Sequence, residues 1–284
     1  MKVGINTYGC RKVFEEDFDK SLDKLKEIGI SSIEICVLTD KEVAFACSAM
    51  SEELLQLMGN SDFSFGFLSM TKAKDYIQKI RKKGFVVDTA HIGLPFIRTD
   101  ENMKIFCADV VDFAKKHGIE CYVFSPMKSL HEIKQDIKII QWLASELKKE
   151  GILFAIHNHH MECESVDGMS AYGYMLEECS SIYLEPDLGW MMVGGMEPIA
   201  FMKKYGTRII RLHLKDFYRD IPYLQEGDER FAPIGEGVLE LEHIIPVIKE
   251  YCCLSEYGLI IDQDGSAGNF LEDIQVGYEN ITAV

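Results

Sequence analysis

Short apolar runs alternate with longer amphipathic stretches along the whole chain, and this alternation constrains the fold more than any other feature. The strand-like runs cover residues 3–7, 32–36, 85–90, 121–124, 153–157, 182–184, 209–213 and 259–262. The helix-like stretches cover residues 15–28, 71–83, 101–117, 131–149, 168–179, 198–205, 241–251 and 269–278. Alternating strands and helices predict a parallel sheet with helices outside it. Eight such units in 284 residues predict an α/β fold of the closed (β/α)8 type, a TIM barrel, rather than an open sheet.

Glycine follows several of the predicted helices. Gly29, Gly84, Gly118 and Gly151 each stand just before a strand-like run. Glycine tolerates the left-handed backbone conformation that ends many helices, so these four positions support the predicted boundaries. No Gly-x-Gly-x-x-Gly sequence follows the first strand, which weakens a dinucleotide-binding interpretation.

The chain is expected to form a single domain over residues 1–284, with one insertion after the second strand. The insertion, residues 38–70, contains a helix-like piece near 52–58 and is too long for a simple connection. Because it follows a strand, it should rise over the end of the barrel where chemistry takes place. It could form a lid, a structural element or a contact in a homodimer.

Composition narrows the functional class. The net charge of −16 disfavours nucleic acid as a partner, because a phosphate backbone would be repelled, but it does not exclude a small phosphorylated substrate. No apolar run is long enough to span a bilayer, and the N-terminus leads directly into a strand without a signal-peptide pattern. Nine irregularly spaced cysteines argue against a disulfide framework and a thiolate zinc site. We therefore expect a cytoplasmic protein with no membrane partner.

Polar side chains stand at or just after the ends of most predicted strands. They are Asn6 and Tyr8, Glu34, His91, Ser125, the 157–162 segment, Glu185 and Asp187, His213 and Lys215, and Asp262 and Asp264. One such residue is usually a helix cap or a buried core group. Four consecutive strands ending in this way, the fifth to the eighth, should bring their side chains together in the barrel mouth. Carboxylates together with imidazole suit Mn²⁺, Mg²⁺, Co²⁺ or Zn²⁺, so the cluster predicts a divalent metal ion.

The motifs in the second half of the chain resemble those of a known family. They are His-Asn-His-His-Met-Glu at 157–162, Asp-Leu-Gly-Trp at 187–190, Gly-Gly-Met-Glu-Pro at 194–198, Arg208 with His-Leu-Lys-Asp at 213–216, and Gly-Glu-Gly at 235–237. In this order and spacing they resemble the xylose isomerase-like TIM barrel superfamily. In particular they resemble the sugar phosphate isomerase/epimerase group, which includes tagatose-type epimerases and inosose dehydratase.

The resemblance implies a set of metal ligands, one each from strands five to eight. Carried onto this sequence they are Glu162, Asp187, His213 and Asp262. The chain departs from the family pattern at two of them. Asp262 stands where the family usually has glutamate, so Asp264 could contribute. At the fifth strand His157 occupies the strand end, where many relatives have the ligand glutamate, so His157 could share or replace Glu162.

The resemblance also implies a reaction. Family isomerases and epimerases remove a proton next to a carbonyl, and one divalent metal ion stabilises the resulting enediolate. The resemblance favours Mn²⁺ as this ion, with Zn²⁺, Co²⁺ or Mg²⁺ as alternatives. The predicted partner is a sugar, a sugar phosphate or a polyol. The implied catalytic residues are Glu162 and Asp262 as bases, with Lys215 and His91. The implied substrate-binding residues are His157, His159, Trp190, Glu34 and Asn6.

Several alternatives remain open at the level of sequence. Lys215 could instead form an ion pair with Asp216 or Glu236, and Trp190 could be a packing residue at the barrel rim. The same parts support a metal-dependent dehydratase, in which Lys215 or His159 would protonate a leaving hydroxyl. A barrel that binds a sugar without catalysis is a third hypothesis. An endonuclease is disfavoured by the eight histidines and the acidic charge.

Overall fold

The barrel predicted from the sequence is confirmed. The computed structural model describes residues 2–50, 62, 66–225 and 227–284. Its wall consists of eight strands: β1 (Val3–Asn6), β2 (Ser32–Leu38), β4 (Thr89–Ile92), β5 (Cys121–Phe124), β6 (Leu153–His157), β9 (Tyr183–Glu185), β10 (Leu212–Leu214) and β13 (Leu259–Ile261). Neighbours pair in parallel in the order β10-β13-β1-β2-β4-β5-β6-β9. Parallel bridges from Leu184 to Ile209 and from Asp187 to His213 complete the ring between β9 and β10.

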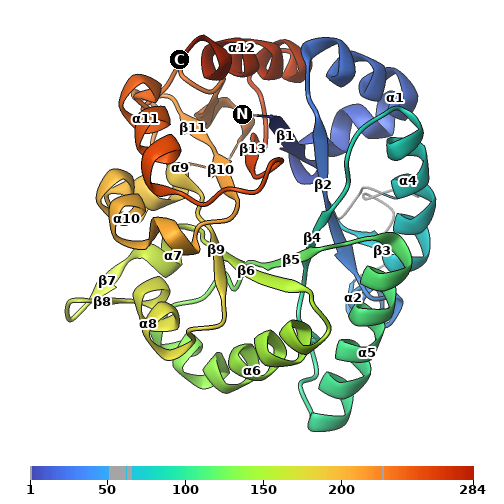
Figure 1. The fold of residues 1–284 in the computed structure, drawn as a ribbon. Helices are drawn as coiled ribbons and strands as arrows, with labels where there is room; N and C mark the ends of the chain where they lie inside the picture. The colour runs from blue at the N-terminus through green and yellow to red at the C-terminus, as the bar shows by residue number, and fades with distance from the viewer. Residues whose placement is uncertain (1, 51–61, 63–65, 226) are drawn as a thin grey trace.

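Helices surround this wall on the outside (Figure 1). They are α1 (Thr7–Ile28), α4 (Met70–Lys82), α5 (Asp100–His117), α6 (Leu130–Lys149), α8 (Ala171–Glu178), α10 (Pro198–Tyr205), α11 (Leu241–Tyr251) and α12 (Phe270–Ala283). The outward-facing strand residues pack against buried helix residues such as Leu22, Ile77 and Ile140, and together they form one large hydrophobic core. Covered strands read as nearly continuous apolar runs, which is why the sequence revealed them. None of the described helices combines the length and apolarity needed to cross a membrane.

The predicted glycine turns are confirmed. Gly29, Gly84, Gly118 and Gly151 all have a positive φ, between 62° and 112°. At Gly29 the backbone N–H donates to the carbonyl oxygens of the last turn of α1. The chain then enters β2 within three residues, as the pattern predicted.

The third predicted strand is displaced toward its C-terminal end. The pattern placed it at residues 85–90, whereas β4 covers Thr89–Ile92. Val86 makes only an isolated bridge to Ser32, and the carbonyl oxygen of Asp88 then accepts the N–H groups of Glu120 and Cys121. Regular pairing therefore begins only at Thr89, and His91 lies within the strand rather than after it.

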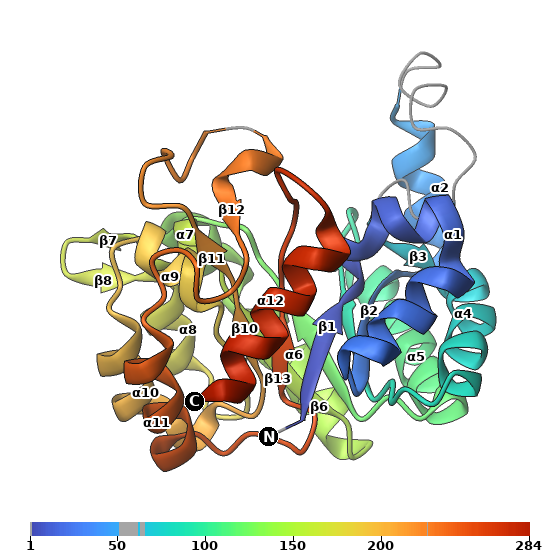
Figure 2. The same cartoon turned by 90° about the horizontal axis from the view of Figure 1, so that it is seen from above.

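The insertion after β2 is only partly described. It includes α2 (Asp40–Ser48), a helix that the sequence pattern did not reveal, and β3 (Leu68–Ser69), which pairs with the end of β2. The helix-like piece near 52–58 lies outside the described residues. Figure 2 shows α2 on the same face of the barrel as β12 (Phe231–Ala232), with the N-terminus at the opposite face. The insertion thus rises on the side where the strands end, and its role as a lid stays a prediction.

Candidate metal centre

Alternation along the strands brings polar side chains into the barrel. The run Arg211-Leu212-His213-Leu214-Lys215 alternates polar and apolar residues, and successive strand side chains point to opposite faces. Leu212 and Leu214 are fully buried in the outer core, so the three polar residues face the interior. All three are nearly inaccessible to solvent. One strand therefore supplies a guanidinium, an imidazole and an ammonium group at successive heights in the barrel.

Glu34 of β2 is the centre of the deeper polar layer. Its Oε1 lies 2.8 Å from Asn6 Nδ2, 2.9 Å from His213 Nε2 and 2.9 Å from His91 Nε2. Its Oε2 lies 3.0 Å from Arg211 Nε. Burial alone would raise the pKa of Glu34, but His91, Arg211 and His213 outweigh that effect and hold the pKa well below its usual range. Glu34 is therefore an ionised carboxylate that orients its neighbours.

Glu185, the last residue of β9, completes this layer. Its carboxylate lies 3.0 Å from Arg211 Nε, 2.8 Å from His91 Nε2 and 3.3 Å from His213 Nε2. Burial raises the pKa of Glu185, and the nearby charge of Glu34 raises it further, although His213 and His91 oppose the shift. The two glutamates are thus held together by one guanidinium and two imidazoles.

The upper layer consists of carboxylates around His213 and Lys215. Asp262 Oδ2 lies 2.9 Å from His213 Nδ1 and 3.0 Å from Lys215 Nζ. Lys215 Nζ also lies 2.6 Å from Asp264 and 3.6 Å from Asp187. Burial alone would lower the pKa of Lys215, but Asp262, Asp264 and Asp187 raise it above its usual value. The alternative ion pair of Lys215 with Asp216 or Glu236 does not form, because Lys215 points into the barrel and pairs with these three carboxylates.

Two overlapping groups of side chains could hold a metal ion. One contains His157, Asp187, His213 and Asp262, and the other contains His91, His157, Glu185 and His213; within each group the ligand atoms lie within 4.8 Å of one another. Three of the four metal ligands expected from the sequence, Asp187, His213 and Asp262, are therefore brought together.

Free polar atoms inside the cluster fit an ion. His157 Nδ1 and Asp187 Oδ2 are buried and have no hydrogen-bond partner within the part of the chain that the structure describes. Burial, together with His213 and His159, lowers the pKa of His157 well below its usual value, so its imidazole is neutral as a ligand requires. Burial raises the pKa of Asp187 to about 7 despite the opposing charge of Lys215. A dication would satisfy both side chains, since buried polar groups normally have partners.

Glu162 lies outside both groups, contrary to the expectation that it would be a ligand and a base. It is the third residue after His159, the N-cap of α7 (His160–Cys163), and its carboxylate accepts the backbone N–H groups of His159 and Lys128. The chain turns into a helix after His159, which carries Glu162 away from the strand end. His157 belongs to both groups, which agrees with the alternative that it shares or replaces Glu162 as a candidate ligand.

The expected substrate-binding residues divide into two sets. Asn6 and Glu34 are committed to other partners: Asn6 caps α1 through Tyr8 N–H and donates to Glu34. His91 likewise faces Glu34 and Glu185, so it supports the cluster instead of offering a free donor. His159 and Trp190 remain candidates for substrate contact.

His159 and Trp190 lie side by side at the upper edge of the cluster. Their ring centroids are 5.8 Å apart, and the ring of His159 lies 5.2 Å from that of His157. Burial and the charge of Lys215 lower the pKa of His159 to about 3, so its ring is neutral. Trp190 also packs edge-on against Phe217 at 5.1 Å, which supports the alternative of a rim-packing residue.

Two residues of the buried cluster were given no role from the sequence. Glu185 was noted only as part of the segment after the sixth strand, and Arg211 was not considered. The alternation of Arg211, His213 and Lys215 on one strand face was the signal that could have found the arginine. Glu185 stands two residues before Asp187, so the same periodicity would have placed both carboxylates inside the barrel.

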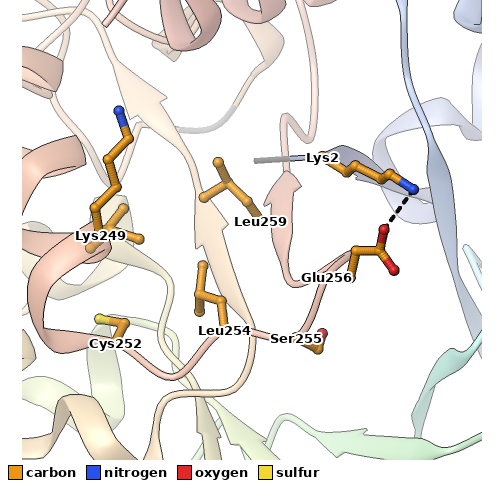
Figure 3. A pocket seen from close by; sticks show the side chains of 8 residues that line it. Lys2, Lys249, Cys252, Leu254, Ser255, Glu256 and Leu259 are labelled. Atoms are coloured by element: carbon orange, nitrogen blue, oxygen red, sulfur yellow. Dashed lines mark ion pairs between the residues drawn. The ribbon is translucent and has the colours of Figure 1, made fainter.

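The hollow shown in Figure 3 lies elsewhere. Lys2, which precedes β1, and Leu259, the first residue of β13, are among its lining residues, so it opens at the face opposite the cluster. Its polar contact is the exposed ion pair of Lys2 with Glu256, at 2.7 Å. Chemistry in such barrels takes place at the other face, so the polar cluster is the candidate site.

The fold and this cluster define a barrel protein with a buried candidate site for a divalent metal ion. A family model described as xylose isomerase-like TIM barrel matches residues 22–254. The chain belongs to that family.

Curated relatives of the chain are inosose dehydratases. The protein from Clostridium botulinum (strain Alaska E43 / Type E3) is 22% identical over 282 residues, which cover 91% of this chain and 86% of the relative. The protein from Clostridium beijerinckii is 29% identical over 109 residues, and that match spans only 36% of the relative and 34% of this chain.

Solved structures share the fold. A sugar phosphate isomerase/epimerase from Parabacteroides distasonis ATCC 8503 has a TM-score of 0.74 at 21% identity, with 100% of this chain and 94% of that chain covered. The IolI protein with a bound zinc atom has a TM-score of 0.65 at 16% identity, with 100% and 97% covered. At these identities the likeness establishes the fold.

Proposed function

We propose that this protein is a divalent-metal-dependent isomerase or epimerase that removes a proton next to the carbonyl of a sugar or sugar phosphate. The observation that carries this proposal is the convergence of His157, Asp187, His213 and Asp262 at the C-terminal end of the barrel strands. The similarity to a sugar phosphate isomerase/epimerase agrees with it.

The four converging side chains would bind the ion. The deeper layer around Glu34 and Glu185 would fix the orientation of His213. When bound, the ion would polarise the substrate carbonyl and stabilise the negative charge that develops on its oxygen. Asp187 and Asp262 supply two negative charges, which a dication balances. Glu34 accepts from His213 Nε2 and so keeps Nδ1 directed at the cluster.

Asp264 fits the role of proton acceptor better than Asp262. The pKa of Asp262 is held well below its usual value: burial would raise it, but Lys215 and His213 outweigh burial, which makes Asp262 a weak base. Burial raises the pKa of Asp264, and Lys215 only partly opposes this. A base whose pKa lies nearer to neutral removes a proton more effectively. Asp264 is also the more exposed of the two carboxylates.

Lys215 is suited to stabilise a substrate oxygen. Its ammonium group is fully buried between Asp262 and Asp264, and its raised pKa keeps it charged at neutral pH. A positioned cation near a developing oxyanion lowers the barrier to proton removal. Trp190 lies beside Lys215, with Nζ 5.6 Å from the ring centroid, and would provide an apolar wall for the substrate.

A metal-dependent dehydratase is the second candidate. The observation that favours it is that the curated relatives are inosose dehydratases. After removal of a proton next to the carbonyl, water would leave from the neighbouring carbon if an acid protonates its hydroxyl. Lys215 is a charged donor in the upper layer of the cluster, so it is the candidate for this acid.

One experiment separates these functions. The metal-loaded protein is incubated in deuterated water with ketoses, their phosphates and keto-inositols, and nuclear magnetic resonance follows deuterium incorporation and loss of water. We expect incorporation next to a carbonyl with retention of all carbon-bound oxygen; loss of water would instead establish the dehydratase. Asp264→Asn should retain the metal and lose exchange, whereas the exposed control Asp112→Asn should behave like the wild type. If the metal-loaded protein catalyses neither process, the remaining hypothesis is a barrel that binds a sugar without catalysis.

A further inference from the structure

We infer that the metal centre of this chain is rich in nitrogen ligands and selects Zn²⁺ or Co²⁺ over Mn²⁺ and Mg²⁺, with His157 as the residue that decides this selectivity. The inference rests on the proposed function, because it concerns the ion at the same site. It goes further by assigning the chemical class of the ion.

Both candidate ligand groups contain the same pair of imidazoles. His157 and His213 belong to each group, and their ring centroids are 4.6 Å apart. An ion in the upper group would add Asp187 and Asp262, giving two nitrogen and two oxygen ligands. An ion in the deeper group would add His91 and Glu185, giving three nitrogens and one oxygen. At least two imidazoles are therefore available wherever in the cluster the ion binds.

His157 is free to act as a ligand. Its side chain is buried, and its Nδ1 has no hydrogen-bond partner among the described residues. The nearest carboxylate oxygen, Oε2 of Glu185, lies 3.9 Å away, which is too far for a hydrogen bond. His213, in contrast, has carboxylates at both ring nitrogens. A buried imidazole nitrogen normally has a partner. A metal ion would serve as this partner, and its positive charge would also be stabilised by the surrounding carboxylates.

The nature of the ligands determines which ion is preferred. Mg²⁺ requires oxygen ligands in near-octahedral geometry and retains several waters. Imidazole nitrogen suits Zn²⁺, Co²⁺ and similar ions, and carboxylate oxygen suits Mg²⁺ and Mn²⁺. A centre with two neutral imidazoles and two carboxylates carries two negative charges and is neutralised by a single dication. Replacing His157 by glutamate would add a third negative charge and exchange a nitrogen ligand for an oxygen.

Two measurements on the full-length protein test the inference. X-ray absorption spectroscopy of the zinc-loaded protein counts imidazole ligands, and competition titrations give the ratio of Zn²⁺ to Mg²⁺ affinity. We expect at least two imidazoles in the wild type, one fewer in His157→Gln, and no change in His243→Gln, which removes an exposed histidine. In His157→Glu the ratio of Zn²⁺ to Mg²⁺ affinity should fall at least about tenfold.

The outcomes separate this inference from the proposed function. The inference would be overturned if the wild-type centre had a single imidazole ligand, or if His157→Gln left the number of imidazole ligands unchanged. Either result would still be compatible with the proposed metal-dependent enzyme. A wild-type protein that binds none of these ions would overturn both. Circular dichroism establishes that the variants are folded; if they are not, the imidazole count of the wild type still decides.

Discussion

Glu34 contacts the far side of the imidazole that is expected to hold the metal. His213 Nδ1 faces Asp262, and its Nε2 lies 2.9 Å from Glu34 Oε1. A carboxylate behind a metal-binding histidine fixes the tautomer and the orientation of the ring. Arg211 and Asn6 hold Glu34 in turn, so the position of the ligand depends on residues that never touch the ion.

Removing the charge of Glu34 should therefore weaken metal binding. In Glu34→Gln we expect metal affinity to fall by about 10–100-fold, because the amide no longer stabilises the required tautomer of His213. Calorimetric titration of the metal-free protein measures the effect. Glu177→Gln, on an exposed face of α8, is the matched control. Equal affinities in wild type and Glu34→Gln would show that Glu34 only fills space.

The pKa of Asp187, raised to about 7 by burial, should make metal binding dependent on pH. Below that pH the carboxyl group holds a proton that the ion must displace, so affinity should fall as pH decreases, by up to about tenfold per pH unit for one proton. The raised pKa of His213 acts in the same direction, because its ring must also lose a proton. Titrations at several pH values measure this slope. A constant affinity between about pH 5 and pH 8 would contradict the assignment of these ligands.

At the scale of elements, Asp216 fixes the loop beside the site. It follows Lys215 at the start of β11 (Asp216–Phe217), and its buried carboxylate accepts the N–H groups of Phe217, Gly235, Gly237, Val238 and Leu239. This arrangement explains the Gly-Glu-Gly motif, since a Cβ at Gly237 would lie 2.4 Å from Asp216 Oδ1. The loop is thereby tied to the strand that carries His213.

Asp216→Asn should destabilise the protein by about 2–5 kcal/mol, because the amide replaces an acceptor by a donor that faces backbone N–H groups. Chemical denaturation measures the free energy of unfolding. Asp112→Asn, which breaks an exposed ion pair with Lys116, should change it by less than about 1 kcal/mol. If the two variants were equally stable, Asp216 would not be what holds the loop.

Most of the strands and helices, but not all, could be predicted from the sequence. Strands covered on both faces produce apolar runs, and several of the helices between them end at glycines, so the order and approximate positions of the barrel elements could be predicted. The third strand was misplaced because Phe85 and Val87 are buried apolar residues like those of a strand, although regular pairing begins only at Thr89. The helix α2 was missed because Asp40–Ser48 has only one fully buried side chain, that of Glu42, and so lacks an apolar stripe.

The structure brings the predicted site residues together where strand ends determine their position, and separates one from the rest where the chain turns. Asp187, His213 and Asp262 converge because neighbouring parallel strands end together. Glu162 lies outside the two groups because a short helix begins at His160, and the direction of a side chain on such a turn depends on contacts that sequence does not contain. Glu185 was given no role because its partners His91 and Arg211 are 94 and 26 residues away in the sequence.

For the whole molecule, metal binding and stability should be coupled. The ligands come from β6, β10 and the segments that follow β9 and β13, so an ion in the cluster would link strands on one side of the barrel. An ion that binds only the folded state at a concentration 100 times its Kd adds about 2.7 kcal/mol of stability. Thermal unfolding should then shift upward by about 5 °C or more. An unchanged Tm on addition of each metal would count against a site formed by folding.

The metal content of the purified protein tests the central claim most directly. Elemental analysis is performed on the wild type beside Asp187→Asn and His213→Ala, with Asp112→Asn as the surface control. We expect about one divalent ion per chain in the wild type and the control, and its loss in the two cluster variants. A folded wild type that holds no ion and takes up none on addition, or cluster variants that retain the full content, would contradict it.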